Sequence, residues 1–229
     1  MNGSVEQLPL AFSHPTKFYS DDLVVTKSNM AAYELIEHWP DWPMPVAVLV
    51  GPRGAGKTHF ASVWADVADA KLISAQEPEE AIKQISLGKS VVIEDVDAQE
   101  IDEVAFFHLF NSVKQANLID TNTTLLLTST IAPLNWNISL KDLISRLKSV
   151  TLATIEQPND ELLTSVAFKL FADRQIKVDT SVISYLISRT ERSLQSLGKF
   201  VDAIDRLALQ RKSKVTRSLI SDVLQDIVE

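Results

Sequence analysis

The sequence predicts an α/β protein in which helices cover a parallel sheet and a small all-helical subdomain follows. Three observations support this fold class. Short apolar, β-branched runs alternate with helical patterns up to residue 157, as is typical of a parallel sheet covered on both faces. A phosphate-loop motif follows the first of these runs. After Pro158 the strand signals stop and only helical periodicity remains.

The elements of the α/β part follow one another in a regular order. The proline-rich stretch 39–45 cannot be helical, so it connects a first helix, capped near Asn29, to the first strand. Apolar runs predict five strands at 46–50, 71–73, 90–93, 123–128 and 149–152. Apolar residues at helical spacing predict helices at 30–38, 57–70, 78–85 and 101–115, with a short helix at 143–147. Ligands of such sheets bind at the carboxyl ends of the strands, where loop 51–58 falls.

The chain divides into three parts. Residues 1–22 lack a helical period, residues 23–157 hold the α/β domain, and residues 158–229 hold the helical lid. Within the lid, periodicity predicts helices at 159–173, 180–189, 193–209 and 215–228.

The composition excludes several classes of protein. No apolar run approaches 18 residues and no signal-peptide pattern is present, so we expect neither a membrane protein nor a secreted one. The absence of cysteine excludes disulfides and fits a cytoplasmic location. The net charge of −8 argues against a protein that coats DNA by itself.

Gly51–Thr58 fits the phosphate-loop pattern G-x-x-x-x-G-K-[ST] without a mismatch, after the apolar run 46–50. The glycines allow backbone N–H groups to surround phosphate oxygens. Lys57 is expected to reach the β- and γ-phosphates, and the Thr58 hydroxyl to ligate Mg²⁺. The motif predicts binding of a nucleoside di- or triphosphate.

Two further strand ends carry groups that a nucleotide site needs. Glu94 and Asp95 end the strand 90–93, with Asp97 close behind, and can hold Mg²⁺ and position water. Acidic residues at strand ends can also be solvated turns. The tip 128–130, Thr-Ser-Thr, offers hydroxyls near a γ-phosphate, although such residues are common at strand ends.

Two segments leave alternatives open. The run Gln7-Leu8-Pro9-Leu10-Ala11-Phe12 either folds back on the core or docks into a partner's groove. The basic residues between 206 and 217 either form a solvated interhelical turn, as is usual for such clusters, or contact the phosphate backbone of a nucleic acid. In isolation, Arg146 is a surface arginine.

The order of these motifs resembles that of AAA+ nucleotide-binding modules, in particular the branch of bacterial replication initiators (DnaA). Val24-Val25-Thr26-Lys27-Ser28-Asn29 resembles their entry segment. Phe106-Phe107-His108-Leu109-Phe110-Asn111 is similar to the helix after their Walker B strand. Leu143-Ile144-Ser145-Arg146-Leu147 resembles their arginine-finger segment. The resemblance implies an AAA+ domain with a five-stranded parallel sheet and a helical lid.

Initiators continue into a helix-turn-helix domain, whereas this chain ends with the lid helices. Its N-terminal run resembles the sliding-clamp-binding motif Q-L-x-L-x-F at Gln7, Leu8, Leu10 and Phe12. A short module of this kind is similar to the Hda-like regulators, the regulatory inactivators of DnaA. That resemblance implies a cytoplasmic, nucleotide-bound regulator that docks on the clamp and promotes hydrolysis of initiator-bound ATP, which prevents re-initiation.

The resemblance also implies roles for individual residues. Arg146 is the finger offered in trans to the initiator's ATP, Glu94 and Asp95 are catalytic, and both bind Mg²⁺ with Thr58. Gln195 stands where the family has its sensor II arginine, and Glu94 where it normally has aspartate, so we expect weak intrinsic hydrolysis and a preference for ADP over ATP. The predicted cofactor-binding residues are Gly51, Pro52, Arg53, Gly54, Ala55, Gly56, Lys57, Thr58, His59, Thr128 and Gln195.

The expected partners are the clamp and DnaA, with DNA reached indirectly through the clamp, no membrane, and homo-oligomers as an open possibility. Two other functions stay open: a non-catalytic adaptor that recruits the initiator or another factor, and a self-sufficient AAA+ ATPase or loader.

Overall fold

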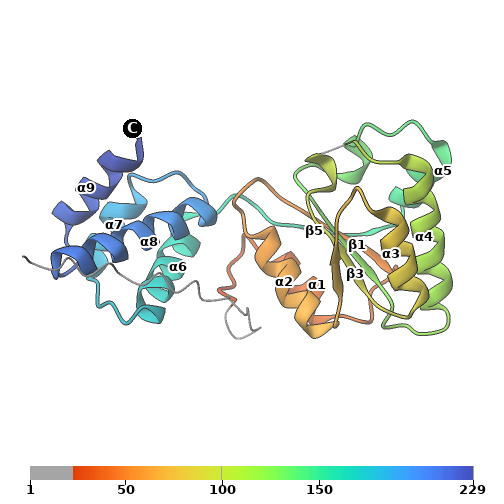
Figure 1. Cartoon of the computed structure of the whole chain (residues 1–229), viewed down its shortest axis with the longest axis horizontal. Helices are drawn as coiled ribbons and strands as arrows, with labels where there is room; N and C mark the ends of the chain where they lie inside the picture. Colours follow the sequence, from red (N-terminus) through yellow and green to blue (C-terminus); the bar gives the residue numbers. More distant parts are fainter. Residues whose placement is uncertain (1–22, 99, 229) are drawn as a thin grey trace, which may run out of the picture.

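The computed structural model describes residues 23–98 and 100–228 (Figure 1). The α/β core contains, in chain order, α1 (Met30–Glu37), β1 (Val46–Val50), α2 (Lys57–Val67), β2 (Lys71–Ile73), α3 (Pro78–Ser86), β3 (Val91–Ile93), η2 (Val96–Ala98), α4 (Glu103–Asn117), β4 (Leu125–Ser129), η3 (Pro133–Asn135), α5 (Lys141–Leu147) and β5 (Thr151–Thr154). The lid contains α6 (Asp160–Asp173), α7 (Thr180–Ile187), α8 (Leu194–Arg211) and α9 (Arg217–Val228).

The sheet is five-stranded and fully parallel, in the order β2-β3-β4-β1-β5, which confirms the predicted fold class. β1 lies between β4 and β5, with Val46 opposite Leu125 and Ala47 opposite Thr151. The chain leaves β1 toward one edge of the sheet and returns through β4. The loop after β1 is therefore at the point where the strand order reverses, and ligands bind there in open α/β sheets.

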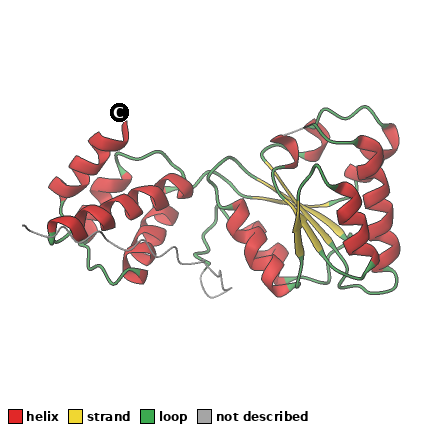
Figure 2. Ribbon diagram, in the orientation of Figure 1, coloured by secondary structure: helices red, strands yellow, loops and turns green. Residues whose placement is uncertain are grey.

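Helices cover both faces of the sheet, because alternate strand residues point to opposite sides (Figures 1 and 2). Val46, Val48 and Val50 of β1 pack toward α3, α4 and α5. Ala47 and Leu49 pack toward α1 and α2. Burial on both faces explains why β1, β3 and most of β4 read as continuous apolar runs, whereas the edge strands β2 and β5 are largely exposed.

The first helix begins differently from the expectation. Asn29 is the residue before α1, but its side chain makes no cap hydrogen bond to the helix. Instead, Asn29 accepts from the Thr26 N–H (2.7 Å) and donates to the Val24 carbonyl (2.9 Å). The asparagine therefore fixes the entry segment, residues 23–29, against the core.

Several element ends differ from the predicted ones by two or three residues. α2 ends at Val67, because the chain turns through a left-handed Asp69 (φ 44°). β4 begins at Leu125, since the Thr124 N–H donates to the Ser90 hydroxyl (3.0 Å). A helix cap or a side-chain hydrogen bond can shift such a boundary without changing the pattern of apolar residues.

The lid is a four-helix unit with its own apolar core, formed by residues such as Leu163, Phe171, Leu186 and Val201. Ser193 caps α8, and its hydroxyl accepts from the Ser196 N–H (3.2 Å). Figure 1 shows the lid on the same side of the sheet as α1 and α2, opposite to α3, α4 and α5.

Candidate functional site

The phosphate loop connects β1 to α2 with the backbone that its glycines allow. Gly54 and Gly56 have φ of +73° and +103°, in the left-handed region that favours glycine. Gly51 packs so closely on the chain after β5 that a Cβ there would lie 2.7 Å from the Ile155 carbonyl oxygen. Other residues at these positions would strain or displace the loop.

Lys57 brings a positive charge inside the loop. Its ammonium donates to the carbonyls of Gly51 (2.9 Å) and Pro52 (3.3 Å), and the residue is only 6% exposed. A buried ammonium needs such partners, because removing a charge from water is costly. The two carbonyls hold the charge where a phosphate group would meet the loop.

A cavity of about 670 Å³ lies between the phosphate loop, the ends of β3 and β4, and the lid. That volume is within the range of small-molecule sites. Among the predicted cofactor residues, the lining includes Arg53, Gly54, Gly56, Lys57, Thr58, His59 and Gln195. Gly51, Pro52 and Ala55 support the loop from behind: Ala55 is 1% exposed, and the other two provide the carbonyls for Lys57.

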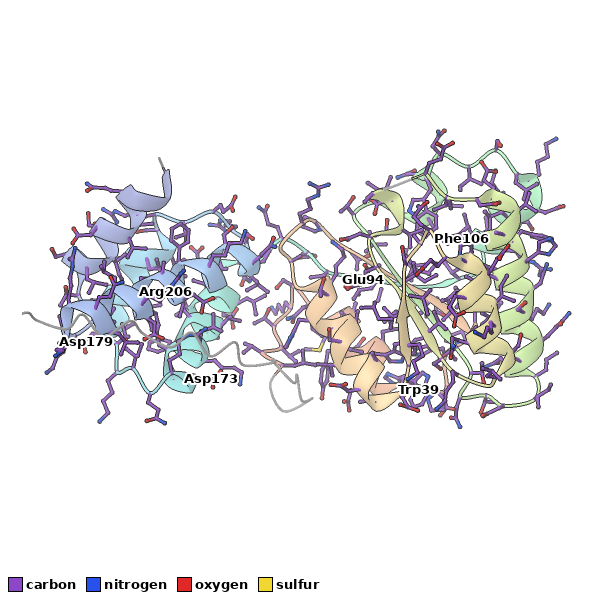
Figure 3. All side chains as sticks on the ribbon, viewed as in Figure 1. Trp39, Glu94, Phe106, Asp173, Asp179 and Arg206 are labelled. Carbon is purple, nitrogen blue, oxygen red and sulfur yellow. The ribbon has the colours of Figure 1, made fainter. Side chains whose placement is uncertain are left out.

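The carboxylates after β3 differ in their surroundings. Glu94 has one carboxylate oxygen that is buried without a hydrogen-bond partner, and Figure 3 shows this residue on the side of the sheet toward the lid. Asp95 is exposed, lines the cavity and has a left-handed backbone (φ 47°). The two residues therefore present oxygen atoms at the same strand end.

These groups fit Mg²⁺, which prefers oxygen ligands and is commonly held by one or two carboxylates together with substrate phosphates. Thr58 and Asp95 line the same cavity. The unpartnered Glu94 oxygen is placed to accept a hydrogen bond from a metal-bound water. In the part of the chain that the structure describes, no three His, Cys, Asp or Glu side chains form a closed metal site. A metal here would rely on the nucleotide for most of its ligands.

At the tip of β4 the structure assigns the cavity to a different threonine from the predicted one. Thr128 is fully buried, and its hydroxyl accepts from the Asp95 N–H (2.9 Å). Thr130, two residues further on, lines the cavity instead. Thr128 thus supports the acidic strand end, whereas Thr130 lines the cavity, and contact of Thr128 with a nucleotide stays a prediction.

Thr130 is joined to Asp97. Both the backbone N–H (3.0 Å) and the hydroxyl of Thr130 donate to the Asp97 carboxylate. Burial raises the pKa of Asp97, but the hydrogen bonds from Thr130 and Ser129 outweigh burial and hold that pKa below its usual value of 3.8. Asp97 is therefore ionised at neutral pH and links the ends of β3 and β4 at the cavity wall.

The hydrogen bonds between Thr130 and Asp97 predict a pH-dependent effect of Thr130→Val. A carboxyl whose pKa is lowered by folding adds stability above its unfolded pKa, and this contribution is lost as pH falls through the folded pKa. We expect Thr130→Val to lower the free energy of unfolding at pH 7 and the difference from wild type to shrink below pH 3.8. Urea unfolding between pH 7 and pH 3 measures it, with Thr130→Ser as the control that keeps the hydroxyl. An equal difference in unfolding free energy at all pH values would contradict a stabilising contact between Thr130 and the Asp97 carboxylate.

The lid wall of the cavity is mostly apolar. Leu162, Val166 and Leu170 of α6 line it together with Leu194 of α8. Lys169 and Asp173, also from α6, line the cavity and form an ion pair of 3.9 Å with each other. The sequence did not single out these residues, because their helical spacing is the same as that of residues in the lid core.

Gln195, at the sensor II position, lines the cavity from the first turn of α8. Arg192 does not take its place, since its guanidinium pairs with Asp160 at the start of α6 (3.1 Å) and is absent from the lining. In this structure the lid offers the phosphates an amide from α8, not an arginine.

The lid contacts the phosphate loop directly. The Leu194 N–H donates to the Gly54 carbonyl (2.8 Å). A Cβ on Gly54 would lie 2.1 Å from the Ser193 hydroxyl, and one on Gly56 would lie 3.2 Å from Leu194 Cδ1. The start of α8 therefore rests on the loop that would hold the phosphates.

Arg146 lies on α5 and does not line the nucleotide cavity of this chain. The side chain is half-buried, and its guanidinium donates to the Asn111 side-chain oxygen on α4 (2.9 Å).

The predicted clamp-binding residues Gln7, Leu8, Leu10 and Phe12 lie outside the described residues. In the described ranges, no helix is long and apolar enough to span a bilayer.

Comparisons with known proteins agree with this geometry. Residues 164–224 match the family model described as "Hda, lid domain". An uncharacterized protein of Haemophilus influenzae is 25% identical over 226 residues, covering 90% of this chain and 91% of that protein. The family match falls on the four lid helices, of which α6 and α8 line the cavity.

Solved structures similar to this chain in fold include DnaA and RuvB proteins. Domain III of DnaA from Thermotoga maritima superposes with a TM-score of 0.74 at 18% identity, covering 92% of this chain and 97% of that one. AMPPCP-bound DnaA from Aquifex aeolicus gives 0.67 at 20% identity, covering 88% and 70%. A RuvB variant from Thermotoga maritima gives 0.71 at 11%, covering 91% and 71%. The chain is therefore similar in fold to DnaA over most of its length, and its lid matches the Hda model.

Proposed function

We propose that this protein regulates replication initiation: bound to an adenine nucleotide and docked on the sliding clamp, it promotes hydrolysis of the ATP held by DnaA. The observation that carries the proposal is an Hda-type lid seated on a complete phosphate loop, in a chain with the DnaA fold. Structural neighbours with this fold include a DnaA bound to AMPPCP.

The cavity supports nucleotide binding by its charge and shape. Lys57 and Arg53 are cations at the end where phosphates would meet backbone N–H groups of the loop. The apolar wall from α6 suits a base at the other end. When bound, Mg²⁺ would neutralise phosphate charge beside Thr58, Glu94 and Asp95.

Intrinsic hydrolysis is proposed to be weak. Because Gln195 is neutral and Arg192 is paired with Asp160, the lid presents no arginine to charge that develops on a γ-phosphate. Asp95 remains available to orient water. The bound nucleotide, ADP by preference, then serves mainly to fix the lid on the loop.

Arg146 is proposed to act on a partner's nucleotide. It is half-buried, held by Asn111 and absent from its own cavity lining, as a residue used in trans would be. In a composite site, its guanidinium would stabilise the charge that develops on the initiator's phosphates.

Clamp docking predicts a specific loss of binding. Replacing Gln7 and Leu8 with alanine should reduce clamp affinity by at least about 100-fold, since such motifs concentrate binding energy in a few anchors. Lys17→Ala, in the same segment but outside the hexapeptide, is the matched control. Surface plasmon resonance on immobilised clamp measures both variants, and clamp binding that survives the double substitution would refute the docking role.

The complete function is tested by phosphate release from ATP-loaded DnaA with clamp on DNA. The proposal expects release above that of the initiator alone, and only with this protein and the clamp together. Recruitment without stimulation would support a pure adaptor, whereas turnover by the isolated protein would support a self-sufficient ATPase.

A further inference from the structure

A group of exposed cations lies at the end of the lid that carries the α8–α9 turn. Lys212 and Lys214 lie in this turn, Arg217 begins α9, and Arg189 follows the end of α7. All four are exposed, while Val215 between them is buried and anchors the turn in the lid core. We call these four residues, together with Tyr185, the lid cationic surface.

Tyr185 joins the two arginines of this surface. The Arg189 guanidinium lies 3.8 Å from the ring centroid, and that of Arg217 lies 5.9 Å from it. Both are cation–π distances. The Arg189 guanidinium also donates to the Ser188 hydroxyl (3.0 Å), and its other N–H groups remain directed away from the ring face. Two like charges on one ring repel each other, so an anion held between them would relieve the repulsion.

Three acidic residues of the lid already have partners outside this surface, so they do not cancel its charge. Asp222 pairs with Arg211 (Figure 3 shows the lid side chains), and Asp202 accepts from Arg174. Glu191 accepts from the Ser196 hydroxyl. Residues 206–217 hold five cations and no acidic residue.

The rest of the chain has the opposite charge. Residues 1–157 contain twenty Asp and Glu against eleven Lys and Arg, whereas the lid, 158–229, contains ten against eleven. A polyanion is therefore repelled by the core and attracted only locally. The lid cationic surface would orient such a ligand toward the end of the lid.

We propose that the lid cationic surface binds the phosphodiester backbone of DNA directly. Proteins bind single-stranded nucleic acid with cations that contact phosphates and aromatic rings that stack on bases. The lid cationic surface offers both, as flexible lysines and a Tyr ring flanked by guanidinium groups. The proposed function brings DNA near only through the clamp. Direct contact would add a second attachment point, independent of the nucleotide cavity.

The test measures binding of fluorescein-labelled DNA, single-stranded and duplex, to the full-length protein by anisotropy at several salt concentrations. The triple variant Lys212→Gln, Lys214→Gln, Arg217→Gln should bind at least about tenfold more weakly at low salt. The slope of log affinity against log salt should decrease by about 2 to 3, roughly one for each lost phosphate contact. Tyr185→Ala should weaken single-stranded binding more than duplex binding, and Tyr185→Phe should retain it.

The matched control removes the same amount of charge elsewhere. In the core, Lys71 and Lys83 are exposed and Lys89 is half-buried, and replacement of all three with glutamine should leave DNA affinity within about twofold of wild type. Thermal unfolding and nucleotide binding confirm that each variant is folded. Equal weakening of both triple variants, or no DNA binding at low salt, would overturn the proposal. So would a triple variant that keeps DNA affinity but loses binding to the clamp or initiator alone, which would assign the surface to an acidic protein partner.

Discussion

Arg146→Ala is expected to abolish the stimulation of DnaA ATP hydrolysis while leaving nucleotide and clamp binding unchanged. An arginine that reaches a partner's phosphates contributes about 10³ to 10⁵ in rate, so the stimulated rate should fall by at least about 10³. The physical reason is loss of a guanidinium that Asn111 holds in place at 2.9 Å. Phosphate release from ATP-loaded initiator, with clamp on DNA, gives the rate.

Two further variants separate chemistry from folding. Asn111→Ala keeps the charge but releases its anchor, so its loss should be smaller, on the order of tenfold, as for a positioning residue. Arg146→Lys keeps a charge without the planar fork and should rescue only part of the rate. If Arg146→Ala also lowers the unfolding midpoint or loses clamp binding, the residue has a structural role and the trans assignment is wrong.

Lys57→Ala is expected to reduce nucleotide affinity by about 100-fold. The ammonium lies inside the phosphate loop, 6% exposed, where its hydrogen bonds to Gly51 and Pro52 aim it at the phosphate position. Two charge-assisted contacts of about 1.5 kcal/mol each correspond to this factor. Titration of a fluorescent ADP analogue measures the affinity.

The matched control is Lys89→Ala, which removes an exposed ammonium paired with Asp69. It should bind the analogue as wild type does. Unchanged affinity in Lys57→Ala would mean that the loop does not use this charge to bind phosphate. The assignment of the cavity as a nucleotide site would then lose its main support.

Much of the fold was predictable because local and global preferences agree. β1, buried on both faces, reads as five consecutive apolar residues, and the glycines that follow occupy backbone conformations unfavourable to other residues. The Ser193 cap of α8 follows the same local preferences, since a hydroxyl before an apolar helical run satisfies free N–H groups.

The cavity wall was less predictable, because it depends on which residue of a local group turns inward. Thr128 and Thr130 are chemically alike, and only the end of β4 and the Asp97 carboxylate decide which one faces the cavity. The α6 residues Leu162 and Val166 share their helical spacing with Leu163 and Ala167 of the lid core. Periodicity marks apolar faces, but it does not state what each face covers.

The bond from the Leu194 N–H to the Gly54 carbonyl joins two main-chain atoms. Its existence therefore does not depend on which side chains the lid carries. Among the twenty amino acids only proline lacks the donor, and proline at the first position of a helix would otherwise be tolerated. Substitutions on the outer surface of the lid should therefore leave this main-chain bond to the loop in place.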